Sequence, residues 1–290
     1  MTNRIGKLCL VAAFALMAST AVSYAQENPC GTPTNPCATP PPGDPNAPPG
    51  EPEPKHPTGA HPTKADYPIA VIDRPLQVVK GMIEIAGNTV NVNLSTDAVG
   101  KPVFVAPTVY YGITDFIAAG VFHSIGLCLT GTDNGCFKTY QDVGVDFRYY
   151  PLHHGNFLLS AHAGVQFLFL DEVAMSALVG AYMQYVITPK IAILFDPTVN
   201  IKLKDVGNSF AIPVWFGYQA NPNIWVFLFT AFGGPFDGFG DAFTGSLGLG
   251  GNYAISNMMD LGLEFQFTNL YGKGGGADGR LLIARFAIRL

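Results

Sequence analysis

The sequence is poor in charge and holds no long basic run. Only 13% of its 290 residues are Asp, Glu, Lys or Arg, and the formal net charge is −5. Nucleic-acid binding requires a basic patch that neutralises phosphates, so the composition gives no support to that function. The Gly-x-Ser-x-Gly, HExxH, P-loop and dinucleotide-binding motifs are also absent. We therefore expect no enzyme, no cofactor and no metal site.

Long apolar runs are lacking after the first 25 residues. No later stretch reaches the roughly 18 uninterrupted apolar residues of a membrane-spanning helix. At the start, a basic segment precedes an apolar run over residues 8–22, and Ser23-Tyr24-Ala25 resembles an A-x-A cleavage site. We interpret residues 1–25 as a signal peptide cleaved between Ala25 and Gln26. The alternative, an anchor helix, is weaker because the run is short and a cleavage site follows it.

Residues 26–68 hold 14 of the 23 prolines and few apolar residues. Such a segment buries too little apolar surface to offset its ordering entropy, so it predicts a disordered periplasmic tether. Cys30 and Cys37 both follow Asn-Pro, and in an exported protein this spacing favours a small disulfide loop, Cys30–Cys37. Metal binding with nearby histidines is the weaker alternative, because the spacing matches no zinc motif.

Residues 69–290 alternate between apolar and polar side chains. A strand has a side-chain period of two, and the pattern recurs about every 18 residues, which is typical of a transmembrane β-barrel with apolar side chains outside. We predict an all-β, antiparallel up-and-down barrel of about twelve strands. The predicted strands are 80–94, 102–111, 116–127, 138–150, 157–170, 175–187, 190–203, 209–219, 223–233, 242–254, 258–269 and 280–290.

Short connections alternate with longer ones that are rich in Gly and Asp, as in barrels with periplasmic turns and extracellular loops. Some features fit the prediction poorly. Residues 224–229 are apolar on both faces, and Pro107, Pro197 and Pro213 fall inside predicted strands, where proline removes a ladder hydrogen bond. A phase change at Gly87-Asn88 predicts a bulge.

The polar face of the strands carries most of the charged groups. We expect the lumen to be lined by Glu84, Asp142, Asp146, Arg148, His162, Asp196, Lys202, Asp260, Glu264, Arg285 and Arg289. These residues either select solutes in a pore or form internal ion pairs that brace a narrow barrel, and for any single residue the brace is favoured. Large aromatic side chains that are expected to point inward favour a narrow or plugged lumen; they are Phe104, Tyr110, Tyr182 and Trp215.

Hairpin arithmetic predicts specific pairs. In an antiparallel hairpin, the numbers of directly opposite residues have a constant sum. A sum of 264 for the strands 116–127 and 138–150 places Cys128 opposite Cys136, which predicts a disulfide. A sum of 549 in the last hairpin pairs Glu264 with Arg285 and Asp260 with Arg289. A sum of 308 sets Asp146 opposite His162 and Asp142 opposite Gln166.

The sequence resembles bacterial outer-membrane β-barrels in three features. It has the alternating terminal pattern Leu282, Ala284, Phe286, Ile288, Leu290 and the turn Tyr111-Gly112-Ile113-Thr114-Asp115. Tyr and Phe also lie near the ends of the predicted strands. The resemblance covers roughly residues 70–290 and points to medium-sized porin- or transporter-like barrels. It implies the outer membrane of a Gram-negative bacterium, contact with lipid, and recognition of the C-terminal strand by the barrel-assembly machinery. Leu290 departs from the aromatic residue that usually ends such chains.

The leading functional hypothesis is therefore a porin or channel through which small solutes pass passively. A closed structural or surface-binding barrel, acting through its extracellular loops, is the alternative. A barrel enzyme acting on lipid is the third and weakest hypothesis, because the lipid-facing side offers His123 with no serine partner.

Overall fold

The computed structural model describes residues 62–290, which are all-β. The strand segments are β1 (Ile83–Asn93), β2 (Val103–Gly112), β3 (Ile117–Phe122), β4 (Leu127–Cys128), β5 (Asp142–His154), β6 (Phe157–Phe169), β7 (Val173–Thr188), β8 (Ile191–Phe195), β9 (Thr198–Lys204), β10 (Ser209–Asn221), β11 (Ile224–Pro235), β12 (Thr244–Ser256), β13 (Met259–Phe267) and β14 (Arg280–Arg289). Three short helical turns accompany them: η1 (Val71–Asp73), η2 (Thr132–Asn134) and α2 (Phe239–Ala242). No helix within residues 62–290 is long and apolar enough to cross a membrane.

Several predictions lie outside the described residues. They are the signal peptide with its Ala25–Gln26 cleavage site, the Cys30–Cys37 bond and most of the proline-rich segment. These stay predictions.

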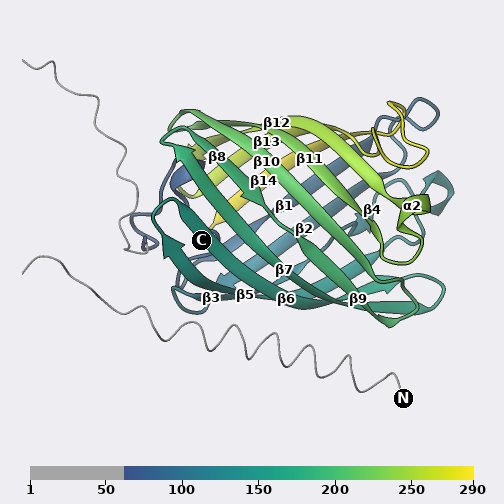
Figure 1. The fold of residues 1–290 in the computed structure, drawn as a ribbon, viewed down its shortest axis with the longest axis horizontal. Helices are drawn as coiled ribbons and strands as arrows, with labels where there is room; N and C mark the ends of the chain where they lie inside the picture. The colour runs from purple at the N-terminus through teal and green to yellow at the C-terminus, as the bar shows by residue number, and fades with distance from the viewer. Residues whose placement is uncertain (1–61) are drawn as a thin grey trace, which may run out of the picture. The chain divides into compact units, whose positions relative to one another are not determined.

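The strand segments form twelve wall spans that close into a barrel. β3 and β4 both pair with β2, and β8 and β9 both pair with β10, so fourteen segments minus two interruptions give twelve spans. Every neighbouring pair is antiparallel, and β1 pairs with both β2 and β14, which closes the sheet (Figure 1). The predicted fold and strand number are confirmed: the chain has the fold of outer-membrane β-barrels.

The two ends of the barrel differ in their connections. At one end the connections are 113–116, 155–156, 189–190, 222–223 and 257–258. At the other they are 94–102, 129–141, 170–172, 205–208, 236–243 and 268–279. We call these the turn end and the loop end. The first and last strands meet at the turn end, where the Ile83 N–H donates to the Leu290 carbonyl at 3.0 Å.

The outer face of the wall is apolar and carries a ring of tyrosines near the turn end. The ring consists of Tyr111, Tyr149, Tyr185, Tyr218 and Tyr253, which are 39–53% exposed. Toward the loop end the exposed side chains include Val109, Val121, Val145, Leu228, Leu249 and Leu263. An apolar band bounded by aromatic residues is the surface that a barrel presents to a bilayer.

The three prolines that fit the prediction poorly all lie at breaks in the wall. Pro197 lies between β8 and β9, and Pro213 faces that break, because β10 pairs with β8 from Val214 onward and with β9 up to Ala211. Pro107 likewise faces the gap between β3 and β4. Proline lacks a backbone N–H, but no ladder bond is lost at such a place, because the strand that it faces is interrupted there.

The bulge predicted at Gly87-Asn88 is confirmed. The register of β1 shifts between Asn88 and Asn91 against β2, and between Ile85 and Val90 against β14.

Asp142 holds the wall together where β3 and β4 separate. Its carboxylate is fully buried and accepts hydrogen bonds from the backbone N–H groups of Ser124, Ile125 and Gly126 at 2.7, 2.9 and 2.5 Å. The Gln166 amide nitrogen donates a further bond at 2.9 Å. The carboxylate thus replaces ladder bonds that the break removes, since charge-assisted bonds to backbone N–H groups are strong.

The predicted registers are wrong by two residues in three hairpins. Gly262 faces Arg285 in the last hairpin, and Arg148 faces His162 between β5 and β6. Val121 faces Val145 rather than Val143. A shift of two keeps every side chain on its predicted face, and diagonal neighbours stay within reach of long side chains. Charge matching therefore did not distinguish the direct pair from the diagonal one.

The Cys128–Cys136 disulfide is confirmed, with a Cα–Cα distance of 6.2 Å. It is not a cross-strand pair, however. Cys128 faces Phe104 of β2, and Cys136 lies in the connection before β5. The bond staples a loop at the loop end.

Candidate functional site: a plugged lumen

Residues 67–82 lie inside the turn end of the barrel and are not part of its wall. We call them the plug. Its buried residues are Tyr67, Ile72, Arg74, Gln77, Val78, Val79 and Met82. Their contacts reach β7, β10, β11 and β13, so the plug crosses the lumen. The wall begins at Ile83 instead of the predicted residue 80, because a turn at Gly81, with φ of +74°, separates plug from strand.

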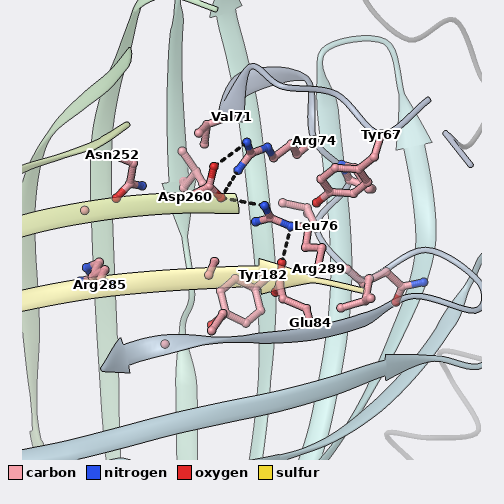
Figure 2. A pocket seen from close by; sticks show the side chains of 18 of the residues that line it. Tyr67, Val71, Arg74, Leu76, Glu84, Tyr182, Asn252, Asp260, Arg285 and Arg289 are labelled. Atoms are coloured by element: carbon pink, nitrogen blue, oxygen red, sulfur yellow. Dashed lines mark hydrogen bonds and ion pairs between the residues drawn. The ribbon is translucent and has the colours of Figure 1, made fainter. Parts of the chain in front are cut away.

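An ion-pair cluster fastens the plug to the wall. Arg74 donates from both terminal nitrogens to Asp260 of β13, at 2.7 and 2.9 Å. Arg289 of β14 donates to the same carboxylate at 2.7 Å and to Glu84 of β1 at 2.7 Å. Figure 2 shows the two guanidinium groups converging on Asp260. Two cations and two carboxylates leave the cluster neutral, which a buried site requires.

Tyr67 covers this cluster. Its ring centroid lies 5.8 Å from the Arg74 guanidinium carbon and 5.1 Å from that of Arg289, which are cation–π distances. Burial is the main cause that raises the pKa of the Tyr67 phenol, to about 12. The phenol therefore stays neutral at physiological pH and adds no charge to the cluster.

Apolar packing and backbone bonds hold the middle of the plug. Ile72 packs among Trp225, Phe227 and Phe229, the inward side chains of β11. Their outward neighbours Ile224, Val226 and Leu228 are exposed on the outer face. This arrangement explains why residues 224–229 are apolar on both faces: one face meets the plug and the other meets the bilayer.

Two glutamines of the wall fix the plug backbone. The Ile72 N–H donates to the Gln219 side-chain oxygen at 3.2 Å, and the Gln184 amide nitrogen donates to the Ile72 carbonyl at 2.7 Å. From the plug, the Gln77 amide nitrogen donates to the Asp115 carbonyl at 3.0 Å. The two bonds to Ile72 satisfy backbone groups of the short η1 turn, and the Gln77 bond satisfies a carbonyl of the 113–116 connection.

A second polar network lies deeper in the lumen. Asp146 accepts from Arg148 Nε at 3.1 Å and from the Tyr110 hydroxyl at 3.0 Å. His162 lies between two carboxylates, with Nδ1 3.5 Å from Asp146 and Nε2 3.0 Å from Asp196. The Arg148 guanidinium also covers the Tyr110 ring at 3.8 Å. Both ring nitrogens of His162 face acids, which does not match the serine–histidine arrangement of a hydrolase.

Glu264 and Arg285 form a third pair, and Gln266 also donates to Glu264. They meet on the diagonal of the β13–β14 hairpin. Lys202, expected in the lumen, is exposed near the loop end. The structure thus brings most of the predicted lumen residues into three networks, with Asp142 serving the wall and Lys202 apart.

Two of the cavities that residues 62–290 form lie inside the barrel. The inner cavity, about 300 Å³, lies against the plug and is bordered by charged residues that include Arg74, Glu84, Asp260, Arg285 and Arg289 (Figure 2). The outer cavity, about 570 Å³, lies toward the loop end, and its lining includes Gln166, Ser176, Asn200, Ser209 and Thr244. None of the described residues that line the outer cavity is ionisable.

The plug residues Tyr67 and Arg74 escaped the sequence analysis, as did Gln184 and Gln219, the side-chain partners of the Ile72 backbone. A usable signal was present. Residues 67–79 are too apolar for a tether, yet they contain two prolines and lack strand alternation. An apolar segment that is neither tether nor strand is suited to fill a lumen.

His123 gives no support to a lipid-facing catalytic site. Its Nδ1 lies 2.6 Å from the Pro107 carbonyl oxygen, which only accepts, so Nδ1 donates and Nε2 accepts from the Tyr140 hydroxyl at 2.9 Å. Both ring nitrogens are thereby used. Among residues 62–290, no group of three or more His, Cys, Asp or Glu is arranged to hold a metal ion.

Comparisons with known proteins find likeness only among solved structures. No family model and no curated protein matches the chain. The NanC porin aligns with a TM-score of 0.49 and 9% identity over 71% of this chain and 98% of its own. The KdgM porin gives 0.49 and 5% over the same shares, and Omp33 of Acinetobacter baumannii gives 0.40 and 12% over 74% and 100%. These values are too low to carry an argument about function, and the barrel assignment rests on the closed sheet itself.

Proposed function

We propose that the protein is an outer-membrane channel for small solutes, with its periplasmic mouth closed by the plug. The observation that carries this proposal is that the plug is separate from the wall. Arg74, Ile72 and Gln77 hold it through local side-chain and backbone contacts, and residues 67–80 contribute no strand to the barrel. Displacement of residues 67–80 would break these contacts and leave the wall ladder intact, including the bonds that Gly81 and Met82 exchange with Gly112 of β2.

The outer surface supports placement in the outer membrane of a Gram-negative bacterium. The apolar band and the tyrosine ring fit lipid on all sides, and short turns belong to the periplasmic side of such barrels. The plug then faces the periplasm and the loop end faces outside. β14, with its outward Leu282, Ala284, Phe286 and Ile288, is the strand that we expect the assembly machinery to recognise.

A closed barrel that acts through its loops is the second candidate. The pairing of lumen charges favours it, because Asp260, Glu264 and Asp146 all contact arginines. Charges that are engaged in such ion pairs brace a barrel, and they exert a weaker electric field on a passing ion.

Planar-bilayer recordings distinguish the two candidates. The full-length protein should open rarely, and Arg74→Ala should raise the open probability about tenfold, the effect of weakening the plug by about 1.4 kcal/mol. Lys80→Ala is the matched control, since Lys80 belongs to the same segment but is exposed. A barrel that lacks residues 67–78, migrates as a folded species, shows no conductance and admits no glucose in liposome-swelling assays would establish the closed barrel instead.

A further inference from the structure

The outer cavity differs in chemistry from the rest of the lumen. The charged networks around Asp260, Glu264 and His162 contribute no residue to its lining. Asp142 lies behind Gln166 and is saturated by three backbone N–H groups. The residues that line this chamber are therefore uncharged, and Lys202, which pairs with the lining residue Ser176, lies beside it at the loop end.

The chamber is nevertheless rich in hydrogen-bonding groups. Gln166 and Ser176 are buried inward-facing residues of β6 and β7. Asn200 of β9 carries the clearest signal: its side-chain oxygen is buried and has no hydrogen-bond partner in the part of the chain that the structure describes. Buried polar atoms are normally satisfied, so an unpaired acceptor at a cavity calls for a donor from a ligand or from water.

The same lining disfavours ions. A charge that leaves water for a cavity without a counter-charge loses solvation, and neutral amides and hydroxyls restore only part of it. A neutral solute with several hydroxyl or amide groups meets no such penalty. The volume of about 570 Å³ falls in the range of small-molecule sites, about 300–1,000 Å³.

We propose that the outer cavity binds small uncharged solutes that carry several hydrogen-bond donors, with Asn200 as the central acceptor. Binding sets the solute class of the channel and, for transport, rests on the function proposed above. The binding itself requires no open pore, since the cavity lies on the loop side of the plug.

Saturation-transfer NMR on the full-length protein in detergent tests the binding. The probes are glucose, gluconate and glucosamine, which share a carbon skeleton and differ in charge. We expect binding of glucose and at least about tenfold weaker binding of the two ions, the effect of about 1.4 kcal/mol. Equal binding of all three, or binding of none, overturns the proposal.

Variants locate the site. Asn200→Leu should weaken glucose binding about tenfold, the size expected for one lost buried hydrogen bond. Asn200→Asp keeps an acceptor at this position and adds a negative charge, so it should largely retain glucose binding and strengthen glucosamine binding. Asn252→Leu is the matched control, because Asn252 borders the inner cavity, and it should leave glucose binding unchanged. An equal loss in Asn252→Leu places the site elsewhere and overturns the assignment.

The two proposals fail in different ways. Glucose binding in a barrel that passes neither ions nor glucose, even after removal of the plug, keeps the site and rejects the channel. Passage of ions or glucose through a barrel that binds glucose, gluconate and glucosamine equally keeps the channel and rejects the site.

Discussion

Arg74 and Asp260 are joined by two hydrogen bonds although 186 residues separate them in the chain. The bond pair ties the segment before the first strand to the next-to-last strand. The Asp260 carboxylate also accepts a hydrogen bond from Arg289, so its negative charge is shared between two buried guanidinium groups. The closure of the turn end depends on this carboxylate more than on either arginine.

Asp260→Asn should therefore destabilise the protein more than Arg74→Ala. The first change leaves two buried cations with one acid between them, and such a loss costs about 3–5 kcal/mol. The second leaves Asp260 paired with Arg289 and should cost about 1–3 kcal/mol. Denaturant unfolding in lipid vesicles gives both values. A larger loss of stability in Arg74→Ala than in Asp260→Asn would show that the plug residue contributes more than the wall residue to the stability of the cluster.

Arg285→Glu should destabilise the barrel because it places a second acid beside the buried Glu264. Breaking a buried pair costs about 3–5 kcal/mol. The double swap, Glu264→Arg with Arg285→Glu, should recover much of that loss, because the diagonal contact is retained. A double variant that unfolds no later than the single one refutes the pairing. Recovered stability with unchanged ion selectivity identifies the pair as a brace.

Asp142→Asn should destabilise the barrel by about 1–3 kcal/mol, because an amide supplies one acceptor where a carboxylate serves three backbone N–H groups. Asp171→Asn is the control: the Asp171 side chain is fully exposed and forms an ion pair with the exposed Lys138, so the loss of stability should stay within about 0.5 kcal/mol. Thermal unfolding followed by gel migration compares them. Equal losses would show that Asp142 does not hold the break.

Mass spectrometry of an unreduced digest should recover the peptide that links Cys128 to Cys136. Reduction should lower the stability by about 2–3 kcal/mol in the chain-entropy model, since the loop that the bond closes is short. The same digest tests the predicted Cys30–Cys37 bond. A peptide that joins Cys30 to Cys128 would contradict both assignments.

Deletion of residues 27–64 should leave insertion and heat-modifiable migration intact. The deleted range ends before Tyr67, so the plug and the wall keep their buried contacts. The truncated barrel should also stay closed, with the conductance of the full-length protein. Loss of the fast-migrating form would make the segment part of the fold.

The sequence by itself determined the wall. Alternation indicated the two faces of the strands, the turn residues indicated where the strands end, and most of the polar residues of the lumen were recognised as a group, because a period of two is a local property that each strand repeats. It also located the loop disulfide, since Cys128 and Cys136 are close along the chain.

Only the tertiary structure decided how the lumen is filled. Arg74 contacts Asp260, and Ile72 packs in one cluster with Trp225, only once the sheet has closed and brought distant strands around one axis. Direct and diagonal pairings of Glu264 with Arg285 look equal in the sequence, because both keep the charges on one face. Asn200 likewise reads as one more inward polar residue. The closed barrel leaves its oxygen without a partner among residues 62–290, because hydrogen-bond satisfaction depends on neighbours that the chain supplies from far away.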